Sequence, residues 1–266
     1  MSDGPFPVLE DGLFVAAASA GPARFGVFDT LLVEHGRAWF VERHLERLAD
    51  ACERFALPAF AARDVVGDLT RFVSALAGRT ALVRTSAFRA GGAPLVRIEA
   101  RAPRRVPADG VEALLVAAAR DPLGAWKTTE RAGRDRHAAE AERAGAFEAL
   151  LELPGGEVVE AARANLFVAL DGALATPPLA RGALPGIVRG LLLEGLPETL
   201  ERALSVDDLR QASEVFLASS GVRVAPLVAI RGLRSGLPGA RGPVARRAAA
   251  ALAAREAAYA AETRAP

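Results

Sequence analysis

Short apolar runs separated by polar turns dominate the first hundred residues and indicate a unit of mixed α and β structure. The pattern predicts, in order, a hairpin over 25–41, helices over 42–57 and 65–76, and strands over 80–88 and 94–102. His35-Gly36 forms the predicted turn of the hairpin, and Pro58 ends the first helix. Strands and helices therefore share one core in this part of the chain.

A stretch with two prolines and a glycine, residues 101–110, is the best candidate for a linker. It predicts an N-terminal α/β domain over 1–105 and a larger C-terminal domain over 106–266. The pattern of the second part predicts a buried strand over 111–119, a helix over 128–145, a meander of short strands over 148–176, a helix near Gly186, a strand over 213–227 and an Ala/Arg-rich helix over 240–263. The predicted fold class is mixed α/β (α+β).

Composition narrows the range of partners. The chain has 266 residues, of which 51% are hydrophobic and 24% charged, and this is enough for a buried core. The net charge is +1 with acids and bases interleaved, which argues against a nucleic acid or an anionic membrane as partner. Cys52 is the one cysteine, so an intramolecular disulfide and a cysteine-built metal site are excluded, no metal is expected, and the thiol is expected in the core. These features favour small-molecule chemistry.

The first residues, 1–12, carry acids where a secretory signal would need a basic segment and an apolar run. No stretch elsewhere is long and charge-free enough to span a bilayer. The expectation is a cytoplasmic enzyme or binding protein.

Lys127 is the one lysine among 33 basic residues, the others being arginines. Arginine can replace lysine as a surface charge, but its guanidinium stays protonated and cannot act as a nucleophilic amine. A lysine kept against such a bias is a candidate for Schiff-base formation. The alternative is a chance survivor on a helix surface.

Pyridoxal phosphate, an aldehyde cofactor, would need a carboxylate at its pyridine nitrogen. Glu160, at the end of the strand EVVE, is suitably placed. The alternative for Glu160 is an exposed acid at a strand end.

The phosphate would need helix N-terminal amides, hydroxyls or a guanidinium. The candidates are the amides of Ile187 and Val188 in LPGIVR, the hydroxyl of Ser220 in SSG, and Arg47 in HLERL. Leu184 and Trp126 could supply apolar walls for the ring. Each of these residues taken singly is more often structural.

The ordered motifs FGVFDTLLVEHG, HLERLADACERF, KTTER, GAFEALLEL, VVEAARANLFVALDGALATPPL, GALPGIVR and SEVFLASSGVRVAPL span nearly the whole chain. In these motifs the sequence resembles the class IV aminotransferase family of fold-type IV pyridoxal-phosphate enzymes. That family includes branched-chain and D-amino-acid aminotransferases and aminodeoxychorismate lyases. The resemblance implies a two-domain fold with a β-barrel-like sheet core in the larger domain, pyridoxal 5'-phosphate as cofactor, and a homodimer.

The resemblance also implies a role for each candidate. Lys127 would be the Schiff-base lysine and Glu160 the partner of the pyridine nitrogen. Arg47, Ile187, Val188 and Ser220 would bind the phosphate, and Leu184 would pack against the ring. The candidates for contacting the substrate are Thr30, Arg89, Arg120 and Arg131. Arg89 and Arg120 would each bind a carboxylate of the substrate. The arginines could equally be solvated surface charges.

Three features make the chain look more like the lyase branch than the transaminase branch. It is short, DACERF follows HLERL, and Arg131 stands four residues after Lys127. Transaminases of the family commonly have a tyrosine near the cofactor hydroxyl, whereas Tyr259 is the one tyrosine here and Ala132 stands five residues after Lys127. The loop FRAGGA lacks the fuller Gly-Arg-Gly pattern of the lyase. The predicted activity is 4-amino-4-deoxychorismate lyase, with branched-chain or D-amino-acid aminotransferase and a non-catalytic ligand-binding homologue as alternatives.

Overall fold

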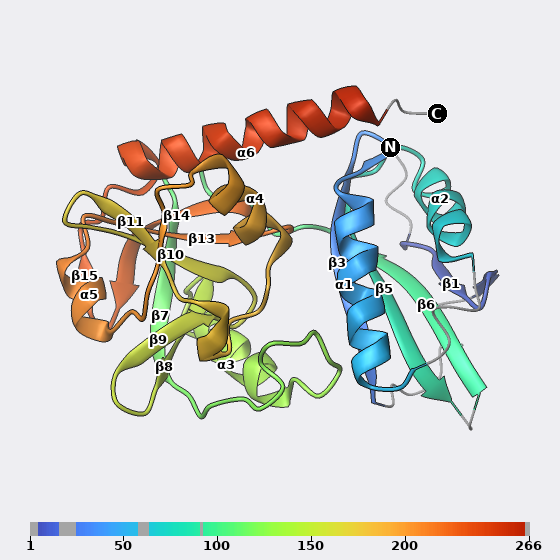
Figure 1. Ribbon diagram of the computed structural model, residues 1–266, viewed down its shortest axis with the longest axis horizontal. Coiled ribbons are helices and arrows are strands. Elements are labelled where there is room, and N and C mark those ends of the chain that lie inside the picture. The colour runs from blue at the N-terminus through green and yellow to red at the C-terminus, as the bar shows by residue number, and fades with distance from the viewer. Residues whose placement is uncertain (1–4, 16–24, 58–63, 91–92, 264–266) are drawn as a thin grey trace. The chain divides into compact units, whose positions relative to one another are not determined.

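The computed structural model describes residues 5–15, 25–57, 64–90 and 93–263, which form two compact units (Figure 1). The first unit consists of Met1–Arg104, Trp126–Glu130 and Thr263–Pro266, and the second of Arg105–Ala125 and Arg131–Glu262. The expected domain boundary, after residue 105, lies beside the first point of division and stays a prediction. The structure adds that the short segment around Lys127 is part of the first unit.

The first unit is a six-stranded sheet with two helices. Its elements are β1 (Val8–Glu10), β2 (Leu13–Val15), β3 (Gly26–Glu34), β4 (Arg37–Ala38), α1 (Val41–Arg54), α2 (Val65–Ala75), β5 (Ala81–Ala90) and β6 (Ala93–Arg101). The strand order is β2-β1-β6-β5-β3-β4, and every pair of neighbours is antiparallel. The predicted hairpin is β3 with β4, and His35 and Gly36 take the positive φ angles, 53° and 75°, that its tight turn requires.

Side chains alternate along β3 as the pleat of a strand requires. Val27 belongs to a core cluster with Leu48 and Cys52 of α1, and Leu31 belongs to a cluster with α2. Asp29 lies between Val27 and Leu31 on the same side of the strand, so β3 presents a carboxylate to α1. Cys52 is 4% exposed, as expected for a core thiol, and burial raises its pKa to about 12.

The second unit is built around a closed sheet. Its elements are β7 (Val111–Ala117), α3 (Ala132–Arg143), β8 (Glu148–Leu153), β9 (Glu157–Ala161), β10 (Asn165–Leu170), β11 (Ala173–Thr176), η3 (Leu179–Arg181), α4 (Ile187–Gly195), β12 (Leu200–Glu201), α5 (Val206–Gln211), β13 (Glu214–Ser219), β14 (Arg223–Arg231), β15 (Arg234–Ser235), η4 (Gly239–Arg241) and α6 (Pro243–Glu262). The sheet runs β12-β11-β10-β13-β14-β7-β8-β9, with β15 beside β14. An additional β9–β10 pairing joins the ends of its six central strands into a barrel. The barrel-like core implied by the resemblance is confirmed.

Two predicted elements of the second unit were wrong in detail. The helix begins at Ala132 and not at Thr128, because Thr128 pairs with Val27 of β3. Residues 213–227 form parts of two strands of a hairpin, β13 and β14, since the chain turns after Ser219 with Val222 N–H bonded to the Ser219 carbonyl at 3.3 Å.

Helix α5 escaped prediction although its start carries a local signal. Ser205 caps the helix by accepting from the Asp208 N–H, and Asp208 accepts from the Ser205 N–H. The helix is only six residues long, which makes its apolar spacing too short to recognise.

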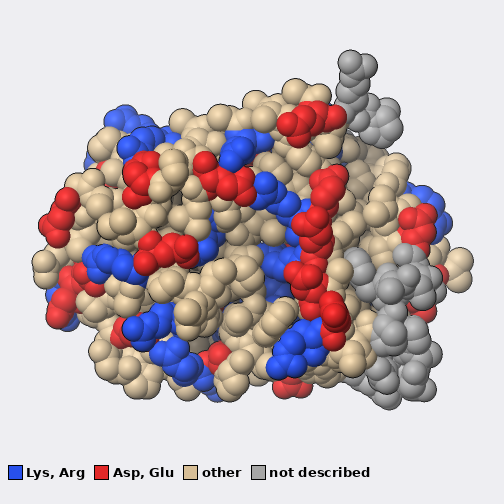
Figure 2. Space-filling view, viewed as in Figure 1, with Lys and Arg blue, Asp and Glu red and all other residues tan. Residues whose placement is uncertain are grey.

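Both charge signs are spread over the face drawn in Figure 2, as the composition predicts. Acidic side chains follow the solvent side of α1, where Glu42, Glu46, Asp50 and Glu53 are exposed. Within the described residues, the structure contains no helix with the length and apolar character needed to cross a bilayer.

Candidate active site

Glu160 lies where the barrel closes. It is the residue of β9 that pairs with Asn165 of β10, and Asn165 in turn pairs with Ala218 of β13. The row Glu160, Asn165, Ala218 therefore runs across one end of the barrel, with Ser219 and Ser220 directly after it along the chain. At 4% exposure, Glu160 is not the solvent-exposed strand-end acid that remained as an alternative.

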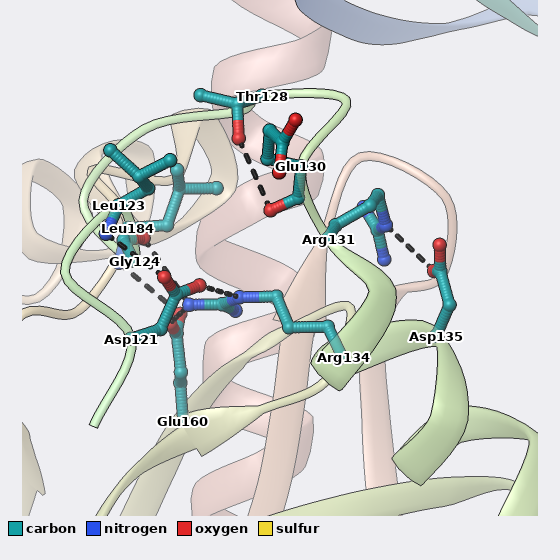
Figure 3. A network of polar contacts seen from close by, with 10 residues as sticks. All are labelled: Asp121, Leu123, Gly124, Thr128, Glu130, Arg131, Arg134, Asp135, Glu160 and Leu184. Carbon is teal, nitrogen blue, oxygen red and sulfur yellow. Dashed lines mark hydrogen bonds and ion pairs between the residues drawn. The ribbon is translucent and has the colours of Figure 1, made fainter. Parts of the chain in front are cut away.

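Both oxygens of the Glu160 carboxylate accept hydrogen bonds (Figure 3). Arg134 donates from Nη2 to Oε1 at 2.6 Å, and the Leu184 N–H donates to Oε2 at 3.2 Å. A buried carboxylate held by a guanidinium and a backbone amide is fixed in direction and stays ionised. Glu160 is thus a fixed negative charge at the end of the barrel.

The N-terminus of α4 lies beside the same row of residues. Asn165 donates from Nδ2 to the Leu184 carbonyl at 2.9 Å, which ties the loop before the helix to β10. A Cβ on Gly186, the N-cap of α4, would collide with the Asn165 Oδ1 atom. The close approach therefore needs glycine, and it positions the amides of Ile187 and Val188, which have no acceptor within the helix.

The backbone of Lys127 extends the first unit's sheet. Phe28 donates its N–H to the Lys127 carbonyl at 2.9 Å, and Thr129 donates its N–H to the Gly26 carbonyl at 2.9 Å. The Gly26 N–H donates to Thr129 Oγ1 at 2.9 Å. The β-branched threonines suit this extended pairing. As a result, hydrogen bonds at the Lys127 carbonyl and at the Thr129 N–H fix the backbone of the residue that carries the amine.

Aromatic rings of the first unit lie next to Lys127 and Trp126. Lys127 Nζ lies 5.4 Å from the centre of the Phe28 ring, within the range of a cation–π interaction. Trp126 packs edge-on against Phe55 of the α1 C-terminus at 5.9 Å between ring centres. Trp126 therefore belongs to the core cluster of α1 and β3 and is a packing residue here.

Asp29, His44 and Arg47 form a buried charged cluster in the same unit. Asp29 accepts from Arg47 Nε at 2.8 Å and Nη2 at 2.9 Å, and its Oδ1 lies 2.6 Å from His44 Nδ1. Burial would raise the pKa of Asp29, but Arg47 and His44 outweigh burial and hold that pKa well below its ordinary value. Burial lowers the pKa of His44, against the opposing effect of Asp29. Arg47 is consequently oriented by a carboxylate that stays ionised.

The cluster predicts that acid weakens the fold of the first unit. As pH falls through 6.5, the ordinary pKa of histidine, the unfolded chain takes up a proton that buried His44 resists. The depressed pKa of Asp29 adds a contribution that is present above its ordinary pKa of 3.8 and is lost only at lower pH. In His44→Gln the melting temperature should fall less between pH 7 and pH 5 than in the unmodified protein. An equal fall in both proteins would contradict the assignment.

Comparison with known proteins identifies the family. Residues 26–230 match the family model for amino-transferase class IV, which is most of the chain. The chain belongs to the class IV aminotransferase family. It is 30% identical over 250 residues to the bifunctional aminodeoxychorismate lyase / D-amino acid transaminase of Mycobacterium tuberculosis, a match that covers 79% of this chain and 83% of that protein.

A second relative within the class IV aminotransferases matches over a shorter stretch. The branched-chain-amino-acid aminotransferase of Escherichia coli K12 is 36% identical over 113 residues, which is 41% of this chain and 36% of that protein. The chain thus aligns with little more than a third of that relative's length.

Solved structures of other proteins agree with the fold of this chain. A hypothetical aminotransferase from Mycobacterium tuberculosis in its PLP-bound form has a TM-score of 0.78 and 27% identity, covering 95% of this chain and 99% of that one. The branched-chain aminotransferase of the thermophilic archaeon Thermoproteus uzoniensis has a TM-score of 0.80, covering 97% of this chain and 98% of that one. Its 23% identity shows the fold alone.

The chain belongs to a family of pyridoxal-phosphate enzymes, and its own residues fit the cofactor. The buried Glu160 carboxylate suits a protonated ring nitrogen. Asn165 lies so close to Gly186 that a Cβ on this residue would collide with it. The amides at the start of α4 are directed away from the helix, as phosphate binding requires. Lys127 supplies the primary amine.

The structure distributes the predicted site residues over both units. Lys127, Arg47, Thr30 and Arg89 belong to the first unit, and Glu160, Leu184, Ile187, Val188, Ser220, Arg120 and Arg131 to the second. Their roles stay predictions. The Thr30 N–H donates to Asp29 Oδ1 at 2.6 Å, and the side chain of Arg89 lies outside the described residues.

The two remaining substrate candidates are engaged in ion pairs. Arg120 Nη2 lies 2.8 Å from Glu157, and Arg131 Nε lies 2.7 Å from Asp135. Both pairs have a partner that is more than half exposed, so their net stabilisation is small and a substrate could displace them.

Several residues of the site were missed in the sequence. Asp29, Asn165 and Arg134 each contact a predicted residue or the loop that holds one, and His44 contacts Asp29. The signal for His44 was available, because it stands three positions before Arg47 on one face of a helix. Asn165 was visible as a polar residue at the start of an apolar strand. Arg134 carried no signal among so many arginines.

Proposed function

We propose that the protein is a 4-amino-4-deoxychorismate lyase, which releases pyruvate and p-aminobenzoate. The observation that carries the proposal is Ala132, which begins α3 five residues after Lys127 and is exposed. Family transaminases commonly have a tyrosine in that position. Both reactions remove the proton from the amino-bearing carbon. Transamination must then deliver a proton to the cofactor carbon, whereas elimination breaks the ring carbon–oxygen bond and the departing enolpyruvate takes up a proton to become pyruvate. A site without that tyrosine therefore favours elimination, which needs no proton delivery to the cofactor.

The reaction rests on a few residues of the chain. Bound pyridoxal phosphate would supply an aldehyde for an amine and a ring that withdraws electrons. The Lys127 amine takes the proton from the substrate carbon that bears the amino group. The Glu160 carboxylate accepts a hydrogen bond from the ring nitrogen, and Leu184 packs against the ring.

The phosphate is bound by groups of three kinds. The amides of Ile187 and Val188 donate to its oxygens, the Ser220 hydroxyl adds a neutral donor, and Arg47, oriented by Asp29, adds a positive charge. Thr30, Arg89, Arg120 and Arg131 are the candidates for the substrate's carboxylates and ring. We also propose a homodimer, and light scattering that gives the mass of a single chain would contradict this.

The alternative is an aminotransferase that acts on branched-chain or D-amino acids. The bifunctional Mycobacterium tuberculosis relative supports both activities, since its name combines them. The shorter match to the branched-chain enzyme supports the aminotransferase. The two reactions share cofactor and lysine, so only their products separate them.

A product assay tests the proposal. The holoenzyme is incubated with aminodeoxychorismate, and in parallel with amino acids and 2-oxoglutarate. We expect pyruvate and p-aminobenzoate in equal amounts from the first mixture, with the Lys127→Ala variant as the measure of uncatalysed breakdown. Glutamate from the second mixture without p-aminobenzoate from the first would establish the aminotransferase instead.

A further inference from the structure

A guanidinium sits directly on the carboxylate that is proposed to face the cofactor ring. Arg134 lies in the first turn of α3, and its Nη2 donates to Glu160 Oε1 at 2.6 Å (Figure 3). The side chains are 16% and 5% exposed, so water screens this ion pair only weakly. The charge on Arg134 therefore acts on whatever proton Glu160 shares.

A second carboxylate partly compensates Arg134. Asp121 Oδ2 accepts from Arg134 Nε at 3.3 Å, and the Gly124 carbonyl accepts from Nη2 at 3.3 Å (Figure 3). Burial lowers the pKa of Arg134, but Glu160 and Asp121 outweigh burial and raise it above its ordinary value. Arg134 is thus a permanent cation that bridges two carboxylates, those of buried Glu160 and partly exposed Asp121.

Such a cation changes the affinity of its neighbours for protons. A positive charge beside a carboxylate favours the ionised form and disfavours an added proton. When the carboxylate shares a hydrogen bond with another base, the proton belongs to the pair, and the cation lowers the proton affinity of the pair as a whole.

We propose that Arg134 is a positioning residue that lowers the proton affinity of the pair formed by Glu160 and the cofactor ring nitrogen. The proposal rests on the proposed role of Glu160. With Arg134 present, Glu160 stays ionised and fixed in direction, but the ring nitrogen loses its proton at a lower pH than beside an unpaired carboxylate. Arg134 thereby limits how strongly the ring withdraws electrons.

Neighbouring elements of the second unit carry other charged groups. Across the barrel closure the neighbour is neutral Asn165. On β8, Glu148 is bonded to Arg163 and Glu152 pairs in register with Val158 of β9. One turn further along α3, His137 lies 3.7 Å from Glu140. At the start of the helix, Arg131 is paired with Asp135.

The test measures the ring-nitrogen proton directly. Holoenzyme is reconstituted with pyridoxal phosphate labelled with 15N in the ring, and the 15N NMR shift is followed against pH. In Arg134→Gln we expect the midpoint of deprotonation about one pH unit higher than in the unmodified enzyme. Arg134→Lys, which keeps the charge, should restore most of the original midpoint.

A second variant, expected to shift the midpoint in the opposite direction, tests the inference even if Arg134→Gln folds poorly. Asp121→Asn removes the acid that compensates Arg134 but keeps an oxygen to accept the Leu123 N–H, bonded at 2.9 Å. Its midpoint should move to lower pH. Arg163→Gln removes a guanidinium from another buried carboxylate, Glu148, and should leave the midpoint unchanged.

The outcomes separate this inference from the function it rests on. A holoenzyme whose midpoint is the same in Arg134→Gln, or unmoved in Asp121→Asn, overturns the inference alone. A chain that binds no pyridoxal phosphate overturns the proposed roles of Lys127 and Glu160 and this inference with them.

Discussion

Replacing Lys127 by arginine is expected to abolish turnover while leaving the fold intact. The substitution keeps a cation near the Phe28 ring, and the backbone bonds to Phe28 and Thr129 do not involve the side chain. It removes the one property arginine lacks, an amine that can lose its proton and bond to an aldehyde. We expect kcat to fall by at least about 10³-fold, because both the covalent link and a general base are lost.

The readout for Lys127 is unusually clean. It is the one lysine in the chain, so borohydride reduction of the holoenzyme should add a single cofactor mass to the peptide that contains it. Lys127→Arg should show no such addition and no visible absorbance from a covalently bound cofactor, with an unchanged melting temperature of the apoprotein. Reductive trapping elsewhere at full yield, or full activity of the variant, would contradict the assigned role.

Replacing Glu160 by glutamine should separate cofactor binding from chemistry. The amide has the same shape and can still accept from the Leu184 N–H, but it carries no charge to balance Arg134 or a protonated ring nitrogen. We expect kcat to fall by about 10²-fold, the size found when one electrostatic partner of a reacting centre is removed. The cofactor should remain bound, since Lys127 and the phosphate groups are untouched.

A matched control distinguishes this loss from damage to the barrel. Glu148 of β8 is as buried as Glu160 and is likewise paired with an arginine, Arg163. Glu148→Gln should lower the melting temperature but keep kcat. Equal losses of activity in both variants would mean that Glu160 acts through the fold and not on the cofactor.

The sequence predicted the elements with strong local patterns and missed those decided by distant contacts. The hairpin at His35-Gly36, the helices at residues 65–76 and 240–263, and the short strands after residue 148 are present as predicted. Residues 128–131 were predicted as helix from their composition, but hydrogen bonds to β3, about a hundred positions earlier, hold Thr128 and Thr129 extended. Tertiary pairing overrode local propensity there.

The residues of the candidate site likewise divide into those that the sequence predicted and those that only distant contacts bring together. Lys127 and Glu160 were predicted because their chemistry is rare in this chain or fixed by motif order. The pair Arg134 and Glu160 could not be predicted, since the two residues are 26 positions apart and arginine is the chain's ordinary base. Ion pairs at the site come from the fold, which brings together residues that no local pattern relates.

The return of Trp126–Glu130 to the first unit has a consequence for how the chain is made. When the ribosome has released only the first hundred residues, β3 lacks two of its later hydrogen bonds. These are the bond from the Phe28 N–H to the Lys127 carbonyl and the bond from the Thr129 N–H to the Gly26 carbonyl. Since domains tend to fold as they emerge, the first unit must wait for some thirty further residues before this edge is covered. The arrival of the reactive lysine and the completion of that sheet are then one event in time.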